Sequence, residues 1–240
     1  MKEIKLNRNT NVPLYKQLAQ VIEVEINNKK YDENFKLPTE NELAKAYDVS
    51  RITVRQALKL LEDKNLISRE VGKGTFIKDN RLNQPIEGSH SFSELIEKEG
   101  FKPGAKLISA SLEIPTDDDI KDLNLEEGEL IVVIKRIRYM NEIPISYEIS
   151  KFPSSFKFLL TKNLDNNSLY KLLYEEKELY FINAKRTIEL VWANDILSEY
   201  LKVEKDYPII LIKGIAEDNY GKISHKAFQY ILGDKFKFTI

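Results

Sequence analysis

Apolar residues near the start of the chain recur every three or four positions, which is the spacing of amphipathic helices. This spacing predicts one helix over Pro13–Asn28, with proline suited to its first turn. It predicts two more over Thr39–Tyr47 and Ser50–Asp63, separated by a short connector. Two helices on so short a connector must cross steeply, so the pattern indicates a helix-turn-helix.

The last of these helices has an apolar face and a polar face. Ser50 can cap it, because the serine hydroxyl can accept a hydrogen bond from the backbone N–H of Thr53. Thr39 and Glu42 fit a capping box at the preceding helix. The apolar stripe consists of Val54, Ala57, Leu58 and Leu61, and the roughly opposite arc of Arg51, Ile52, Arg55, Gln56 and Lys59. We expect the stripe to pack on a neighbouring helix and the arc to face outward, as a charged arc does on any solvated helix.

A strand pattern follows the helices. Leu66–Glu70 and Gly74–Ile77 alternate around Val71, Gly72 and Lys73, which predicts a basic hairpin with glycine at its tip. The order of helix, turn, helix and hairpin favours a winged helix-turn-helix, a unit that places one helix in a DNA groove.

The stretch Lys78–Gly88 is polar, contains Pro85 and has no periodicity, so we interpret it as an interdomain linker. The predicted organisation is a DNA-binding domain over residues 1–78, a linker over 79–88 and a second domain over 89–240. In the second domain, strand patterns lie at Ala105–Ile114, Leu130–Met140, Ile143–Lys151, Leu179–Trp192, Ile209–Asp218 and Lys222–Leu232. Helix patterns lie at Ser91–Glu99, Asp117–Leu123, Ser168–Glu176 and Ala193–Leu201. Short turns between adjacent strands predict hairpins, and therefore a mainly antiparallel sheet and an α+β fold class.

Two arginines continue an apolar strand face. Side chains alternate along a strand, so Val132, Ile134, Arg136 and Arg138 share one face. Such a face is either a core strand that emerges into solvent or the wall of an anion site, and the alternation alone favours emergence into solvent. Two guanidiniums match the oxygen pairs of a phosphate better than lysines do.

The opposing strand adds a carboxylate to this face. With a three-residue turn at Asn141–Ile143, Arg136 faces Glu148, and Arg138 faces Ser146. Glu148 is then partly a structural ion pair and partly a possible partner for a sugar hydroxyl. At the preceding helix start, further donors come from Ser89, His90 and Ser91.

Composition narrows the function classes. Residues 1–78 contain 15 Lys and Arg against 11 Asp and Glu, a net charge of +4, whereas the remainder contains 22 against 27, a net charge of −5. The basic excess therefore lies in the part that would bind phosphates. The chain has no cysteine, two histidines and neither a glycine-rich phosphate loop nor an HExxH motif, so we expect no catalysis, cofactor or metal site. No apolar run approaches the roughly 20 residues of a membrane span, and we expect a cytoplasmic protein that does not bind membranes.

The first third resembles the winged helix-turn-helix of the GntR family of bacterial transcription regulators. The resemblance rests on Pro13–Tyr15, Leu37–Glu40, Val49–Arg51, Thr53–Leu58 and Gly72–Phe76. It implies DNA contacts from the helix over Ser50–Asp63, from the start of the helix before it, and from the hairpin, which is called the wing. The residues in question are Thr39, Asn41, Ser50, Arg51, Ile52, Thr53, Arg55, Gln56, Lys59, Gly72, Lys73, Gly74 and Thr75. Asn41 and Ile52 depart from the arginine and the polar residue of many members, which leaves the operator sequence open.

The second domain is similar, more loosely, to the UTRA domain of the HutC branch of that family. The similar phrases are Ser91–Glu94, Gly100–Pro103, Lys135–Arg138, Pro144–Glu148, Ser168–Tyr170 and Gly233–Phe236. Such domains resemble chorismate lyase in fold and bind small metabolites, often phosphosugars. The implied effector contacts are Ser89, His90, Ser91, Phe92, Arg136, Arg138, Glu148, His225 and Tyr230. His225 stands where amino-sugar sensors often carry glutamate, and a surface histidine is the favoured interpretation over a ligand contact.

These resemblances imply a repressor that binds a palindromic double-stranded operator as a homodimer. They also imply that a small effector releases it, and the expected class of effector is a phosphorylated sugar. Two alternatives stay open: a sensor of a non-sugar metabolite such as an amino acid, a fatty acid or a urocanate-like acid, and a lyase-like enzyme fused to a DNA-binding domain. The pocket distinguishes them, because a phosphosugar needs Arg136 and Arg138 turned inward with Ser91, whereas an acyl group needs an apolar tunnel.

Overall fold

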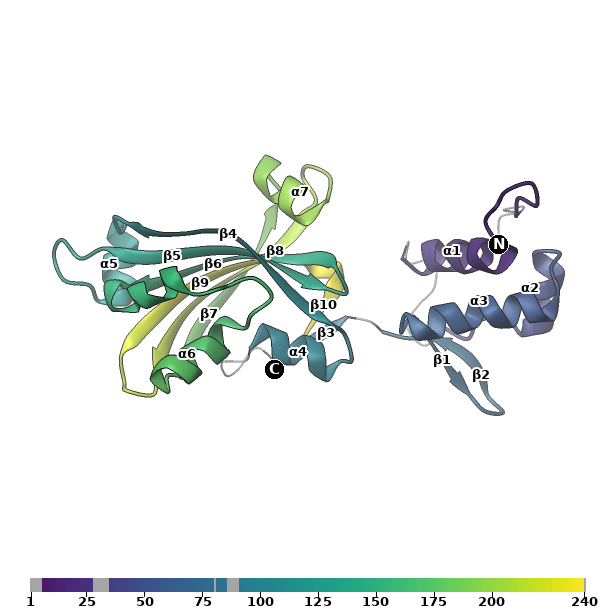
Figure 1. Ribbon diagram of the computed structural model, residues 1–240, viewed down its shortest axis with the longest axis horizontal. Coiled ribbons are helices and arrows are strands. Elements are labelled where there is room, and N and C mark those ends of the chain that lie inside the picture. The colour runs from purple at the N-terminus through teal and green to yellow at the C-terminus, as the bar shows by residue number, and fades with distance from the viewer. Residues whose placement is uncertain (1–5, 28–34, 80, 86–90, 240) are drawn as a thin grey trace. The chain divides into compact units, whose positions relative to one another are not determined.

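The structure is a computed structural model that describes residues 6–27, 35–79, 81–85 and 91–239. The chain divides into two compact units, residues 1–80 and 81–240, and each is described by itself (Figure 1). Among the described residues, no helix is both long and apolar enough to cross a membrane.

The first unit is three helices followed by a hairpin. The helices are α1 (Leu14–Asn27), α2 (Glu40–Ala46) and α3 (Arg51–Asp63), and the strands are β1 (Ile67–Glu70) and β2 (Gly74–Ile77). The Ser50 hydroxyl accepts a hydrogen bond of 3.1 Å from the Thr53 N–H, and Thr39 forms the capping box with Glu42. The predicted order of elements and both predicted caps are confirmed.

One apolar core holds these helices in place. The stripe of α3, Val54, Ala57, Leu58 and Leu61, is buried together with Leu18 and Ile22 of α1. A fully buried leucine stabilises a fold by about 1.5–3 kcal/mol relative to an exposed one, so this stripe fixes which side of α3 faces inward. The opposite arc therefore faces outward, as predicted.

The tip of the hairpin requires glycine. The Lys73 N–H donates to the Glu70 carbonyl over 3.0 Å, which closes a turn, and Gly72 at its third position has φ +77°. A positive φ at this position is typical of a type II turn. A residue with a Cβ atom adopts it only at a cost in free energy, which glycine does not incur. The turn leaves Lys73 exposed at the end of the hairpin.

The second unit is built on a six-stranded antiparallel sheet in the order β4-β5-β6-β9-β8-β7. Its strands are β4 (Pro103–Glu113), β5 (Ile131–Met140), β6 (Ile143–Pro153), β7 (Phe181–Trp192), β8 (Pro208–Asp218) and β9 (Ile223–Leu232). The helices are α4 (Phe92–Lys98), α5 (Asp117–Leu123), α6 (Leu169–Lys177) and α7 (Asp195–Leu201), with 3₁₀ turns η1 (Ser154–Thr161) and η2 (Gly233–Lys235). The predicted α+β class with a mainly antiparallel sheet is confirmed.

Helices cover both faces of this sheet. On one face, α6 and η1 bury Val132 and Ile134 of β5 with Phe152 of β6. The same face carries α4 farther along the strands. On the other face, α5 packs on Ile131 and Val133, and α7 packs on Ile137. Since alternate residues of β5 serve opposite cores, the face of Val132 and Ile134 is also the face on which the two arginines lie.

Part of the predicted linker is a strand. Residues Leu82–Pro85 form β3, which pairs in parallel with β10 (Phe236–Thr239) at the other end of the chain. Leu82 is fully buried beside Phe92 and Phe236. A four-residue strand with one inward apolar side chain carries no periodicity, so sequence patterns missed it. Residues 86–88 of the predicted linker lie outside the described residues.

The β5–β6 hairpin has the predicted pairing and the predicted short turn at Asn141 and Glu142, but not the three-residue turn from which the pairing was inferred. Arg136 lies opposite Glu148, and Arg138 lies opposite Ser146. Met140 pairs with Ile143, however, so the turn has two residues, both with positive φ, as in a type I′ turn. A register shift just after Arg138 supplies the extra residue that the three-residue turn would have supplied.

Candidate functional site

The outer arc of α3 carries exposed basic and polar side chains. Arg51, Arg55 and Lys59 are all exposed, and Ile52 is 69% exposed, an unusual position for an isoleucine. Thr39 and Asn41 at the start of α2 and Gly72 and Lys73 on the hairpin are exposed too. The remaining predicted DNA-binding residues are Ser50 and Gln56, which are exposed, and Thr53, Gly74 and Thr75, which are half-buried.

One carboxylate lies among the arginines of this surface. Arg55 donates from Nε to Glu40 Oε1 over 3.3 Å and from Nη2 to Glu40 Oε2 over 3.0 Å. Arg51 Nη2 lies 4.0 Å from the same carboxylate, and Arg69 Nη1 lies 3.8 Å from it. The hydrogen bond from Arg55 holds the pKa of Glu40 below its ordinary value, so the carboxylate is ionised at neutral pH. Sequence patterns missed both Glu40 and Arg69, because α2 and β1 meet α3 only in the folded unit.

In the second unit, Arg136 and Arg138 are buried, with 2% and 3% of their surfaces exposed. The interpretation that this strand face emerges into solvent is therefore wrong. The arginines are covered because α4 and α6 extend over the same face (Figure 1). Arg138 lies over the ring of Phe92, with 4.8 Å between its guanidinium carbon and the ring centroid.

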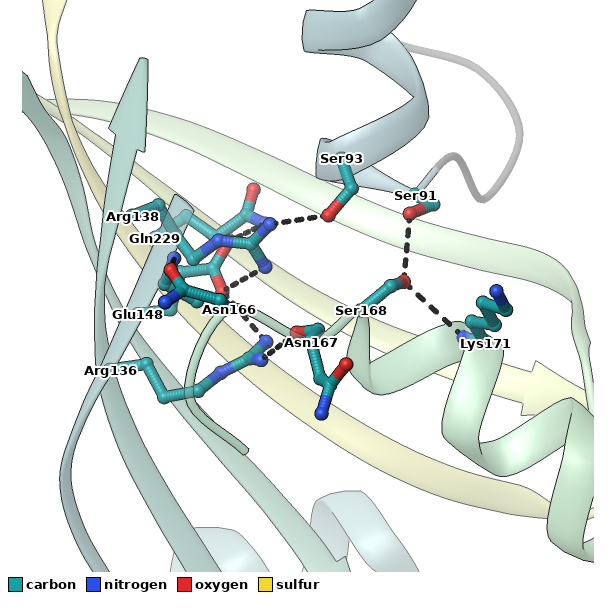
Figure 2. A network of polar contacts seen from close by, with 11 residues as sticks. Ser91, Ser93, Arg136, Arg138, Glu148, Asn166, Asn167, Ser168, Lys171 and Gln229 are labelled. Carbon is teal, nitrogen blue, oxygen red and sulfur yellow. Dashed lines mark hydrogen bonds and ion pairs between the residues drawn. The ribbon is translucent and has the colours of Figure 1, made fainter. Parts of the chain in front are cut away.

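Glu148 joins the two arginines (Figure 2). Arg136 Nη2 donates to Glu148 Oε2 over 3.3 Å, and Arg138 Nη1 lies 3.6 Å from the same oxygen. Gln229 donates to the other carboxylate oxygen over 3.3 Å, and Arg136 Nη1 donates to the Asn167 carbonyl over 3.1 Å. Burial, with repulsion from Arg138, lowers the pKa of Arg136 to about 10, so the Arg136 guanidinium remains cationic at neutral pH.

Three serines lie beside this cluster. The hydroxyls of Ser91 and Ser168 are 3.1 Å apart, and Arg138 Nη2 donates to the Ser93 hydroxyl over 2.8 Å (Figure 2). Ser168 caps α6, where its hydroxyl accepts from the Lys171 N–H. Two buried guanidiniums with nearby hydroxyls form a set of donors for an anion with several oxygens.

His225 is buried, contrary to the favoured interpretation of a surface histidine. It is 3% exposed and stacks on Phe152, with 4.5 Å between ring centroids and 7° between planes. Its Nε2 atom has no hydrogen-bond partner among the described residues. Burial, followed by the positive charges of Arg136 and Arg186, lowers its pKa to about 3, so the ring is neutral at physiological pH.

The burial of His225 makes stability depend on pH. The unfolded chain protonates this histidine near pH 6.5, whereas the folded chain resists protonation down to about pH 3. The unfolded state therefore binds more protons in this window, and the free energy of unfolding should fall as the pH falls, by up to about 2 kcal/mol between pH 7 and 5. Urea titrations at the two pH values measure this. His225→Phe keeps the aromatic stack and should remove this decrease; an equal decrease in the variant would show that other groups cause it.

The buried cluster borders a cavity that consists of two neighbouring chambers with shared lining residues. One, of about 390 Å³ including the space open to solvent, is lined by Arg136, Arg138, Glu148 and Ser168. The other, of about 610 Å³ and partly open to solvent, is lined by Arg186, Ile212, Gln84 and Pro85. The chambers share Ser91, Phe92, Tyr170, His225, Ala227 and Gln229. Ser150, Ser168, Tyr170, Arg186 and Gln229 were not predicted; Ser150 and Gln229 could have been found by alternation from Glu148 and His225.

The structure does not bring Tyr230 to this cavity. Its ring lies on the opposite face of the sheet, 6.0 Å from the ring of Tyr147, in the core under α7. The reason is the period of two along β9, which separates it from His225 and Gln229. Ser89 and His90 lie outside the described residues. Within the described part of the chain, no cluster of three or more His, Cys, Asp or Glu could hold a metal ion.

A winged helix-turn-helix joined to a domain with a buried polar cavity is the architecture of DNA-binding regulators that carry a ligand-binding domain. Residues 14–77 match the bacterial regulatory proteins of the gntR family, and residues 98–237 match the UTRA domain. The chain belongs to the gntR family and fits its HutC branch.

Its similarity to known regulators extends over nearly the whole chain. It is 29% identical to the HTH-type transcriptional repressor NagR of Bacillus subtilis, over 98% of this chain and 96% of that protein. It is 27% identical to the mannosyl-D-glycerate transport/metabolism system repressor MngR of Escherichia coli, over 95% of both. The crystal structure of PhnF from Mycobacterium smegmatis has the same fold, with a TM-score of 0.65 and 20% identity over 92% of this chain and 97% of that one. The chain is therefore a transcription regulator of repressor type.

Proposed function

We propose that this protein is a homodimeric repressor that releases its operator when a phosphorylated sugar binds the cavity of the second unit. The observation that carries the effector proposal is the burial of Arg136 and Arg138 against that cavity. Keeping two guanidiniums out of water is costly unless charged partners compensate them, and Glu148 supplies only one negative charge. A phosphate dianion supplies two.

The rest of the cavity suits a sugar better than an acyl chain. Hydroxyls, an amide and a carboxylate line the chamber around the arginines, from Ser91, Ser168, Gln229 and Glu148. An acyl sensor would need an apolar tunnel in the same place. MngR, a relative by sequence, is named for a sugar-conjugate system, which agrees with this ligand class.

The DNA contacts in this proposal are the exposed residues of α3 and the hairpin. Arg51 and Arg55 would read base edges or phosphates in the major groove, and Lys73 at the hairpin tip would approach the minor groove. A dimer would present two such surfaces to an inverted repeat. Support for a dimer comes from edge strand β7, which exposes Ile188, Leu190 and Trp192 by 43–59% on one side. A second copy covering these side chains would remove them from water.

Operator release by a phosphosugar tests the proposal. An operator selected from random duplexes by the full chain, labelled with a fluorophore, is titrated in the presence of glucose 6-phosphate, fructose 6-phosphate, glucosamine 6-phosphate or the unphosphorylated sugars. We expect one phosphorylated compound to weaken operator binding by about 5- to 150-fold, a typical coupling between sites. Arg138→Ala should bind the operator normally and lose this response, because the variant lacks one of the two phosphate ligands.

Two results would contradict separate parts of the proposal. Operator affinity that no phosphorylated compound changes would remove the phosphosugar. A stoichiometry of one chain per inverted repeat would remove the dimer. Lys171→Ala serves as the control for Arg138→Ala, since this exposed cation lies next to the cavity wall on α6 and pairs only with Glu175 in the described structure.

A further inference from the structure

Glu40 stands out because a carboxylate on a DNA-binding surface opposes phosphate binding. It is the first residue of α2, and its side chain is 24% exposed. Three guanidiniums surround it: Arg55 at 3.0 Å, Arg69 at 3.8 Å and Arg51 at 4.0 Å. A negative charge in this place lowers affinity for any duplex, so its benefit must lie in something other than phosphate attraction.

The geometry of the contact between Arg55 and Glu40 indicates what Glu40 contributes to DNA recognition. Arg55 uses Nε and Nη2 toward Glu40, in a two-point contact along one edge of the guanidinium. A guanidinium has five N–H donors in a rigid fork. The Glu40 contact engages two of them, so Nη1 and the second hydrogen of Nη2 remain to form a paired contact with O6 and N7 of a guanine. Glu40 thereby restricts the rotation of a long, exposed side chain without occupying the edge that reads a base.

Arg69 strengthens the same arrangement from β1. Its Nη2 donates to the Arg55 backbone carbonyl over 3.3 Å, and its Nε lies 3.7 Å from Glu62 near the end of α3. Glu40 therefore connects α2, α3 and the hairpin through charged contacts. Holding an arginine in the geometry that it needs on DNA reduces the entropy that is lost on binding.

We infer that Glu40 is a positioning residue for DNA recognition. It holds Arg55 in the orientation that reads the operator. Its negative charge lowers the affinity for every duplex, while the positioned arginine increases the discrimination between sequences. This inference rests on the proposed role of Arg55 in base recognition.

The test compares Glu40→Gln with Glu70→Gln in the full chain. Both variants remove one negative charge, but among the described residues Glu70 pairs only with Lys73 at the hairpin, over 2.9 Å. The probes are the selected operator duplex and a shuffled duplex of equal length and composition, over a range of salt concentrations. Glu40→Gln should bind the shuffled duplex more tightly yet lose about 10-fold or more in the ratio of the two affinities, within the range for one paired base contact. Glu70→Gln should bind both duplexes more tightly and keep the ratio within about threefold.

A double-mutant cycle separates positioning from a structural role. If Glu40 acts through Arg55, then Glu40→Gln should not lower the affinity ratio further in an Arg55→Ala background. A ratio unchanged in Glu40→Gln, or lowered equally in both backgrounds, would overturn the inference. If Glu40→Gln unfolds the first unit, Glu40→Asp carries the test, because a shorter carboxylate keeps the charge and should still lower the ratio. A wild-type protein that fails to distinguish the two duplexes would instead refute the proposed DNA recognition itself.

Discussion

Replacing both Arg51 and Arg55 by alanine should weaken binding to the selected operator by about 30-fold to more than 10,000-fold, the combined effect of losing two contacts worth about 1–3 kcal/mol each. The fold should survive, because both side chains are exposed and the apolar stripe of α3 is untouched. The slope of log affinity against log salt should also become shallower, since two cations no longer displace counterions from DNA. Fluorescence anisotropy with labelled duplexes measures both quantities.

A matched control removes two cations elsewhere in the same unit. Lys16 lies exposed on α1, and Lys64 follows α3 and pairs with Glu23 of α1 over 2.6 Å. The double alanine variant of these lysines has the same net charge as the arginine variant but should keep specific binding within a few-fold. If both double variants lost affinity equally, general charge rather than the outer arc of α3 would account for binding.

Replacing Glu148 by alanine should destabilise the second unit by about 3–5 kcal/mol, the usual effect of leaving a buried charge without its partner. Arg136 and Arg138 would then repel one another within the core, with Gln229 left without its acceptor. The only tryptophan of the chain, Trp192, lies in this unit, so urea unfolding followed by its fluorescence reports on the unit. Glu175→Ala is the control: its pair with Lys171 is exposed, and such pairs contribute about 0–1 kcal/mol.

Inorganic phosphate gives this variant a second test. An anion bound between the arginines would replace the lost carboxylate, so phosphate should stabilise Glu148→Ala more than it stabilises the wild type. A free energy of unfolding within about 1 kcal/mol of the wild type would indicate that the guanidiniums reach solvent in the variant. Stabilisation of both proteins to the same extent would place the phosphate elsewhere.

The first unit could be predicted from sequence because its signals are local. The Ser50 cap, the Thr39–Glu42 capping box and the stripe through Leu58 each depend on residues within a turn or two of helix. The turn at Gly72 is equally local. The position of Glu40 among three arginines was not predictable, since it depends on how α2 and β1 fold against α3.

The cavity of the second unit shows the same division. The expected hairpin pairing correctly placed Arg136 opposite Glu148, but alternation along β5 could not decide whether the two arginines are exposed or buried. That choice depends on α4 and α6, whose covering of β5 is a contact between distant parts of the sequence. The same holds for His225, which Phe152 and Phe181 enclose from other strands. The alternation rule would, however, have excluded Tyr230, which differs in parity from His225 along one strand.

The parallel pair of β3 and β10 has a practical consequence. Gln84 and Pro85 of β3 line one chamber, and β3 begins the second unit soon after the first one ends. A molecule in that chamber thus touches the very segment of backbone that leads back toward the DNA-reading helices. The partner of that segment is β10, the last strand among the described residues, so a truncation that removes β10 would leave this segment unpaired.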